Sequence, residues 1–152
     1  MSTWYPRRSQ EVFIVLFALD DLGGDNTRRA VIDHISKEGW YEVTADDLAP
    51  TATSLESRYR IDLAWARKDA VLRDCINNLE RNAWGLSRRG HDVLDRWIAA
   101  FRCGRLDLRQ CEFFSLKLKQ RIDPRFEPSL NDRQRSRAPA FSVSHAYAVA
   151  AF

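Results

Sequence analysis

Two arginines with helical spacing are the residues of this sequence best suited to bind a charged partner. Arg60 and Arg67 are seven positions apart with Ala64 between them, so on an α-helix the three lie above one another. Lys68 and Ser57 flank them. A guanidinium fork binds phosphate or carboxylate groups in a bidentate manner, and a small residue between two forks lets a helix approach closely. The spacing therefore predicts a helix that presses against an anionic partner.

The element that must position these arginines is one long helix, expected over Leu55–Arg73. One of its arcs has the i, i+4, i+7 spacing of a buried face and consists of Leu55, Tyr59, Leu63, Ala66 and Ala70. A second apolar edge consists of Ile61, Trp65 and Leu72, which predicts that the helix is packed from two directions. Asp62 and Asp69 lie on the same helix, so an internal salt bridge is the alternative role for Arg67.

Residues that could form a catalytic or metal site are not grouped in the sequence. The three cysteines, Cys75, Cys103 and Cys111, form no Cys-x-x-Cys pair and are expected to be buried small hydrophobes. The strand-like segment 111–119 carries Lys117 and Lys119, but neither has an acidic residue two positions before it, as a restriction-type nuclease requires. We therefore expect a non-enzyme without a metal or a cofactor.

Composition indicates one ordinary domain and places the positive charge. The chain has 152 residues, of which 45% are hydrophobic and 30% are charged. No apolar run has the roughly 18 to 20 residues of a membrane span, so a cytoplasmic protein without a membrane partner is expected. The net charge is +3, yet residues 25–91 carry eleven Lys and Arg against eleven Asp and Glu. Binding of an anion there would need the cations gathered on one side.

The first predicted helix is strongly apolar and spans Gln10–Leu22, ending at Gly23-Gly24. Phe13 and Phe17 form a second edge at i, i+4. They either lie under another helix of the same chain or form a self-association face, which would make the protein a dimer.

A second helix is expected from a cap at 25–27 to Glu38, with a stop at Gly39. Arg28 and Arg29 lie in its first turn, where cations oppose the helix dipole and a phosphate would relieve the cost.

After the long helix, the sequence predicts a β-hairpin. Its strands are Cys75–Leu79 and Ala83–Leu86, and the turn contains Arg81 and Asn82, of which asparagine tolerates a positive φ. Ser87-Arg88-Arg89-Gly90 closes the hairpin and begins another helix. The predicted fold class is mainly α with a small β-hairpin, in which a helix is followed by a two-stranded wing.

Several motifs resemble the N-terminal domain of Mrr-type restriction proteins over roughly residues 9 to 100. They are Ala18-Leu19 through Gly23-Gly24, Arg58 and Arg60 with Leu63, Trp65-Ala66-Arg67, and Trp84-x-Leu86-Ser87-x-x-Gly90. The resemblance implies a winged helix-turn-helix, which in that family usually precedes a nuclease domain. Where the family usually has glycines, this chain has Asp74-Cys75 and Asn82-Ala83, which implies a wing of different shape.

The winged-helix resemblance assigns the basic residues to double-stranded DNA. In such a domain the long helix enters the major groove, and the wing and helix termini touch the phosphate backbone. The candidates for base edges or groove walls are Arg60, Arg67, Lys68 and Ser57. The candidates for backbone contacts are Arg28, Arg29, Arg81, Arg88 and Arg89.

Three expectations about organisation follow. The winged-helix domain spans 9–102, residues 103–122 form an additional helix or strand packed on it, and 123–152 form a flexible basic arm. The expected function is a non-catalytic DNA-binding module, related to the recognition domain of modification-dependent restriction endonucleases or forming the recognition part of a truncated one. The alternative is a protein-interaction or dimerisation module that does not bind DNA directly.

Overall fold

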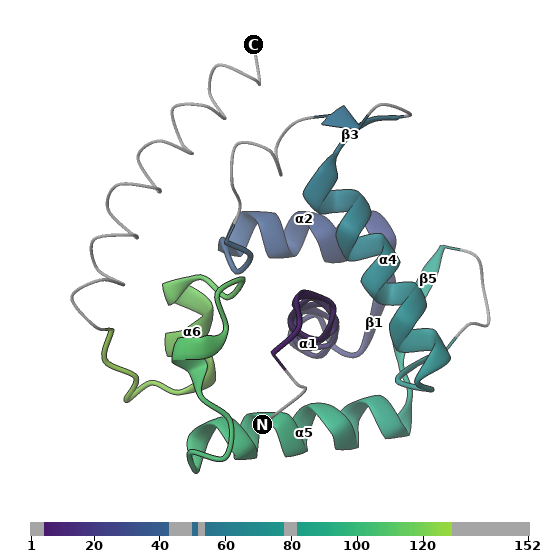
Figure 1. The fold of residues 1–152 in the computed structure, drawn as a ribbon. Helices are drawn as coiled ribbons and strands as arrows, with labels where there is room; N and C mark the ends of the chain where they lie inside the picture. Colours follow the sequence, from purple (N-terminus) through teal and green to yellow (C-terminus); the bar gives the residue numbers. More distant parts are fainter. Residues whose placement is uncertain (1–4, 43–49, 52–53, 78–81, 129–152) are drawn as a thin grey trace.

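The computed structural model describes residues 5–42, 50–51, 54–77 and 82–128, and its fold is mainly helical with a small sheet (Figure 1). The helices are α1 (Arg7–Asp21), α2 (Arg28–Glu38), α4 (Arg58–Leu72), α5 (Arg88–Arg102) and α6 (Leu116–Ile122), with a 3₁₀ turn, η1 (Leu108–Gln110). The strands are β1 (Asp25–Thr27), β2 (Pro50–Thr51), β3 (Ser54–Ser57), β4 (Ile76–Asn77) and β5 (Ala83–Leu86). The mainly α fold class with a small β component is confirmed. Within the described ranges, none of the helices has the length and apolar character needed to cross a bilayer.

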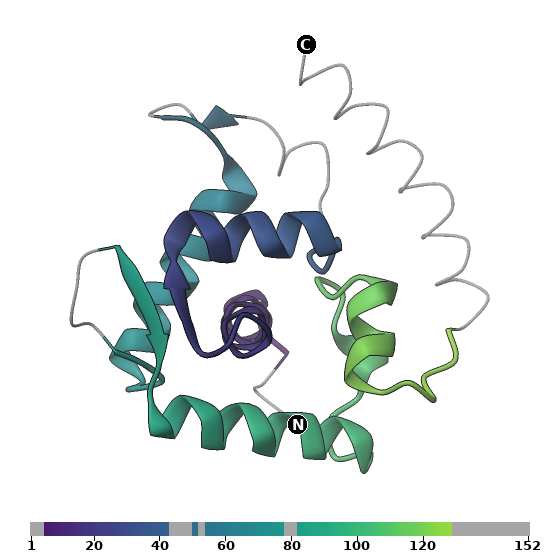
Figure 2. The same cartoon turned by 180° about the vertical axis from the view of Figure 1, so that it is seen from behind.

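Helix α1 forms the centre of the molecule, and the other helices surround it (Figures 1 and 2). Every residue from Ser9 to Leu19 is buried, as expected for a helix that is apolar on all sides. Phe13 is fully buried and Phe17 is 9% exposed. Their rings contact Trp97 and Phe101 of α5, Phe114 and Trp40. The assignment of Phe13 and Phe17 to a dimerisation face is therefore wrong, because the chain covers both rings itself.

The three-stranded sheet is antiparallel in the order β1-β5-β4. Strand β5 is central, with Asn26 opposite Trp84 on one side and Ile76 opposite Leu86 on the other. The paired β4 and β5 agree with the predicted hairpin, whose turn lies partly outside the described residues. Strand β1 was not predicted, since its three polar residues show no alternation. Thr27 still caps α2 as expected, because its hydroxyl accepts the Ala30 N–H at 3.1 Å.

Helix α4 begins at Arg58, three residues later than predicted, because Ser54–Ser57 form strand β3, which pairs with β2. Its buried face packs on α1 and consists of Tyr59, Leu63, Ala66 and Ala70, four of the five predicted residues. The fifth, Leu55, lies in β3 instead. The prediction of packing from two directions is wrong. Trp65 is 52% exposed and Leu72 is 76% exposed, so the second apolar edge faces outward.

The segment after α5 consists of the 3₁₀ turn η1 and helix α6. Helix α6 contacts α5, and its Leu118 and Ile122 are fully buried. Cys75 and Cys111 are buried as expected. Cys103 is exposed at the end of α5, so the prediction that it is buried was wrong. The predicted basic arm spans 123–152, and its residues from 129 onward lie outside the described part of the chain.

Candidate functional site

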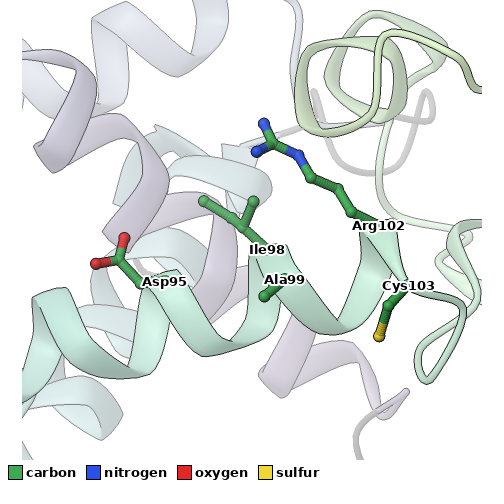
Figure 3. Close-up of a pocket in the computed structure, with 5 residues that line it drawn as sticks. All are labelled: Asp95, Ile98, Ala99, Arg102 and Cys103. Carbon is green, nitrogen blue, oxygen red and sulfur yellow. The ribbon is translucent and has the colours of Figure 1, made fainter.

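A hollow on helix α5 is the first surface feature to consider as a site (Figure 3). It is lined by Asp95, Ile98, Ala99 and Arg102 of α5 and by Cys103, which directly follows that helix. The Arg102 side chain is already engaged, since its Nε donates to the Ile122 carbonyl at 2.8 Å. Among the residues that the structure describes, no second helix or strand lines the hollow. The hollow therefore lacks the convergent polar groups of a ligand site.

The surface of greater interest is the solvent side of α4, here called the α4 outer face, made of Ile61, Ala64, Trp65, Lys68 and Leu72. These positions lie opposite the buried arc of the helix, and Trp65, Lys68 and Leu72 are exposed. Trp65 and Leu72 are the exposed large hydrophobic residues of the described part of the chain. The Lys68 Nζ lies 5.0 Å from the centre of the Trp65 ring, within the range of a cation–π contact. The centre of this face is thus apolar and carries one cation.

Arg60 does not project from the centre of the α4 outer face but turns toward α2. Its Nη2 lies 2.8 Å from Oδ1 of Asp33, and its side chain is 22% exposed. Asp33 also forms an ion pair with Arg29, in which the Arg29 Nε lies 3.7 Å from Oδ2 of Asp33. Arg60 therefore ties α4 to α2, an ion pair between elements that the sequence did not predict.

The Arg67 side chain extends from α4 toward strand β5. Its guanidinium carbon is 5.8 Å from the centre of the Trp84 ring, and Trp84 is buried. This contact joins the two motif blocks, Trp65-Ala66-Arg67 and Trp84-x-Leu86-Ser87-x-x-Gly90. Asp62 and Asp69 were the predicted salt-bridge partners of Arg67. In the structure, Asp62 pairs with Arg7 at 3.4 Å and Asp69 pairs with Arg73 at 3.0 Å.

The cations proposed for backbone contacts gather on the side of α4. Helices α2 and α5 both begin on the side of the molecule that carries α4 and β5 (Figures 1 and 2). Arg28 and Arg29 begin α2, and the backbone N–H of Arg28 donates to the Asn82 carbonyl beside β5 at 3.3 Å. Arg88 and Arg89 begin α5 and are exposed. This set of four arginines is called the cationic rim.

Two other residues, Ser57 and Arg81, were predicted to bind DNA. Ser57 occupies the N-cap position of α4, but its side chain makes no capping hydrogen bond. Arg81 lies outside the described residues.

The start of α5 is joined to the end of α4 by the second motif block. The Ser87 hydroxyl accepts the Gly90 N–H at 2.9 Å and donates to the Asp74 carbonyl, and the Ser87 N–H donates to the Cys75 carbonyl at 3.0 Å. A Cβ on Gly90 would lie 2.1 Å from that Cys75 oxygen, so only glycine fits. Asp74, where the resembling family usually has glycine, has a left-handed φ of 60°.

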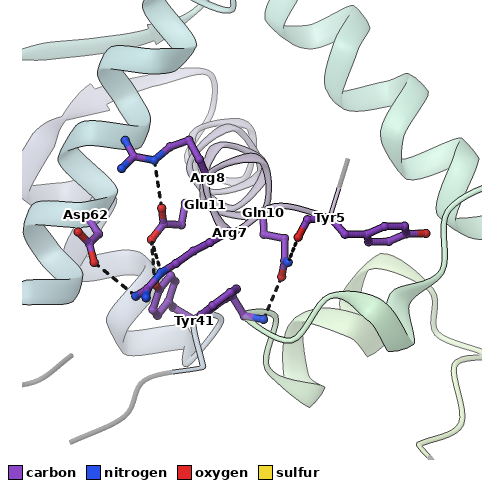
Figure 4. Close-up of polar contacts among 8 residues, drawn as sticks. Tyr5, Arg7, Arg8, Gln10, Glu11, Tyr41 and Asp62 are labelled. Atoms are coloured by element: carbon purple, nitrogen blue, oxygen red, sulfur yellow. Dashed lines mark hydrogen bonds and ion pairs between the residues drawn. The ribbon is translucent and has the colours of Figure 1, made fainter. Parts of the chain in front are cut away.

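A buried polar network holds α4 against α1, and sequence reasoning missed it (Figure 4). Glu11 is 1% exposed and accepts hydrogen bonds from the Tyr41 hydroxyl at 2.8 Å and the Arg7 Nε at 3.3 Å. Arg7 also reaches the Tyr41 oxygen at 2.8 Å and Asp62 of α4 at 3.4 Å. Burial raises the pKa of Glu11 above its usual value, although the Tyr41 hydrogen bond and Arg7 act in the opposite direction. The sequence did carry a signal for this network: Glu11 lies one helical turn after Arg7 and Arg8, at the start of an apolar helix.

Metal-binding and histidine chemistry find no support in the described part of the chain. No group of three or more His, Cys, Asp or Glu residues there could hold a metal ion. His34 pairs with α1, because its Nε2 lies 2.8 Å from Oδ2 of Asp21 at the end of that helix.

No family model, no curated protein and no solved structure matches this chain. The binding partner of the chain is therefore inferred from the arrangement of its own residues.

Proposed function

We propose that the chain is a winged-helix module that binds double-stranded DNA without cutting it, related to the recognition domain of Mrr-type restriction proteins. The observation that carries the proposal is the order of its elements. Helices α2 and α4 are followed by the antiparallel pair β4 and β5, and β1 adds to β5 to give the strand order β1-β5-β4. This is the arrangement expected of a helix-turn-helix with a wing, and it makes α4 the helix that enters a groove.

The charges on the side of α4 support an anionic partner there. The cationic rim places arginines at the starts of two helices, where the helix dipole also favours an anion. Lys68 on the α4 outer face is exposed, and Arg29 has a 90% exposed side chain. Arg60 and Arg67 would act mainly by holding α4 in place, because they contact Asp33 and Trp84. The proposed contacts to DNA therefore shift from these two arginines to Lys68 and the cationic rim.

Fluorescence anisotropy with a labelled duplex across a salt series tests this proposal. We expect Lys68→Ala and Arg29→Ala each to weaken binding and to reduce the slope of log K against log salt by about one. Arg125→Ala is the matched control, because it removes one exposed arginine that follows α6, a helix on the opposite side of α1 from α4 (Figure 1). Equal losses in all three variants would mean nonspecific charge attraction, and absence of binding at low salt would refute the proposal.

A protein-interaction module is the second candidate, and one observation favours it. Trp65 and Leu72 expose apolar surface on the same helix face, as a docking surface for another protein would. Under this alternative, the protein would bind no DNA at low salt and would self-associate in analytical ultracentrifugation. Leu72→Asp should then return it to the monomer.

A further inference from the structure

The apolar centre of the α4 outer face has a consequence for which DNA the protein would bind. Ile61, Ala64 and Leu72 have no hydrogen-bonding group in their side chains, and Trp65 has only its indole N–H. A helix in the major groove usually distinguishes base pairs by hydrogen bonds to their edges. Apart from Lys68 and the single indole donor, this face cannot read bases in that way.

The groove offers one apolar group to such a face. The major-groove edge of thymine carries a C5-methyl group beside its O4 acceptor, whereas the edges of guanine, cytosine and adenine carry donors and acceptors without a methyl group. An apolar side chain set against a guanine or cytosine edge would leave those polar groups without partners, which is unfavourable. Set against a thymine methyl, the same side chain gains contact area.

We propose that the α4 outer face recognises thymine C5-methyl groups in the major groove, through Trp65 and Leu72, and so favours duplexes rich in A·T pairs. This inference rests on the proposed DNA-binding function. Trp65 and Leu72 are two helical turns apart on one side of α4, so together they contact bases at two places along the groove. Arg89 donates to the backbone oxygen of Arg73 at the end of α4. Arg29 shares Asp33 with Arg60 nearer the start of α4. Arginines of the cationic rim therefore lie beside both ends of α4, which favours DNA as the occupant.

Uracil provides the sharpest test, because it differs from thymine by the C5-methyl group alone. Binding is measured by anisotropy on two duplexes of equal length and salt, one of alternating A and T and one of alternating A and U. Each contacted methyl group that is removed should weaken binding about fourfold. A G·C duplex of the same length should bind more weakly than the thymine duplex.

Two variants assign the effect to the proposed residues. The double variant Trp65→Ala, Leu72→Ala should bind the thymine and uracil duplexes equally. Lys68→Ala should weaken binding to both by the same factor and so leave their ratio unchanged. Both exposed residues can be replaced without opening the core, and circular dichroism checks that the double variant is folded.

The outcomes separate this inference from the proposed function. Equal affinity of the native protein for the thymine and uracil duplexes would overturn methyl recognition and leave DNA binding intact. A preference for thymine that persists in the double variant would also overturn it, because the methyl groups would then be read elsewhere. Failure to bind any duplex, with self-association through Leu72, would refute both proposals and favour the protein-interaction candidate.

Discussion

Replacing Gly90 with alanine should destabilise the protein by about 3 kcal/mol, because the new Cβ has no room. It would lie 2.1 Å from the backbone oxygen of Cys75, an atom that no change of side-chain rotamer can move away. Overpacking of this kind costs up to about 3 kcal/mol. Moving Gly90 away would also strain the hydrogen bond from its N–H to the Ser87 hydroxyl, a cap worth about 1 kcal/mol. Alanine returns about 1 kcal/mol as the better helix former, which leaves the net loss near 3 kcal/mol.

Urea unfolding followed by tryptophan fluorescence measures this loss, and Gly85→Ala is its matched control. Gly85 lies in the same motif, but a Cβ there would meet its nearest neighbour, the Cβ of Asp25, at 3.6 Å, an ordinary contact. Gly85→Ala should therefore change the free energy of unfolding by less than about 1 kcal/mol. If Gly90→Ala were as stable as the control, α5 would not approach the Cys75 carbonyl as closely as described. The structural explanation of the motif glycine would then be wrong.

Two further predictions concern Asp74 and Glu11. Asp74→Gly should raise the free energy of unfolding by about 0.5 kcal/mol, since glycine adopts the left-handed φ of 60° without strain; Asp74→Ala, which keeps a Cβ, should give no gain in the same urea assay. For Glu11, burial raises the pKa in the folded state, so the folded protein holds this proton more tightly than the unfolded chain. Its stabilising contribution is therefore complete below the unfolded pKa of about 4.5 and falls as pH rises through the higher folded value. The stability of the native protein minus that of Glu11→Gln should decrease over this interval in urea titrations at successive pH values, and a difference that increases would contradict the assigned direction.

Sequence reasoning placed the elements whose signal is local. The run 12–19 is apolar on every side, which predicts a buried helix wherever it lies in the chain. Glycines at 23, 24 and 39 marked the helix ends, and all three have positive φ. Strand β1 has no such signal, because it exists only through its pairing with β5.

The errors at the candidate site come from the limits of periodicity. Helix α4 has two apolar arcs, and only the position of α1 decides that the arc with Leu63 is buried while the arc with Trp65 is exposed. The partners of Arg60 and Arg67 are distant in sequence, so no spacing rule identifies Asp33 or Trp84. The same limit made Phe13 and Phe17 a candidate dimer face. Phe13 is instead covered by Trp97, Phe101 and Phe114, and Phe17 packs against Trp40.

The contacts at the two ends of α4 also bear on how fast and how tightly it would bind. Arg7 holds Asp62 near the start of the helix, and Arg67 holds the Trp84 ring nearer its end. A helix fixed at both ends is already arranged for its partner before they meet, so little conformational entropy is lost on association. Variants of the outer face should therefore change the lifetime of the complex much more than the rate at which it forms.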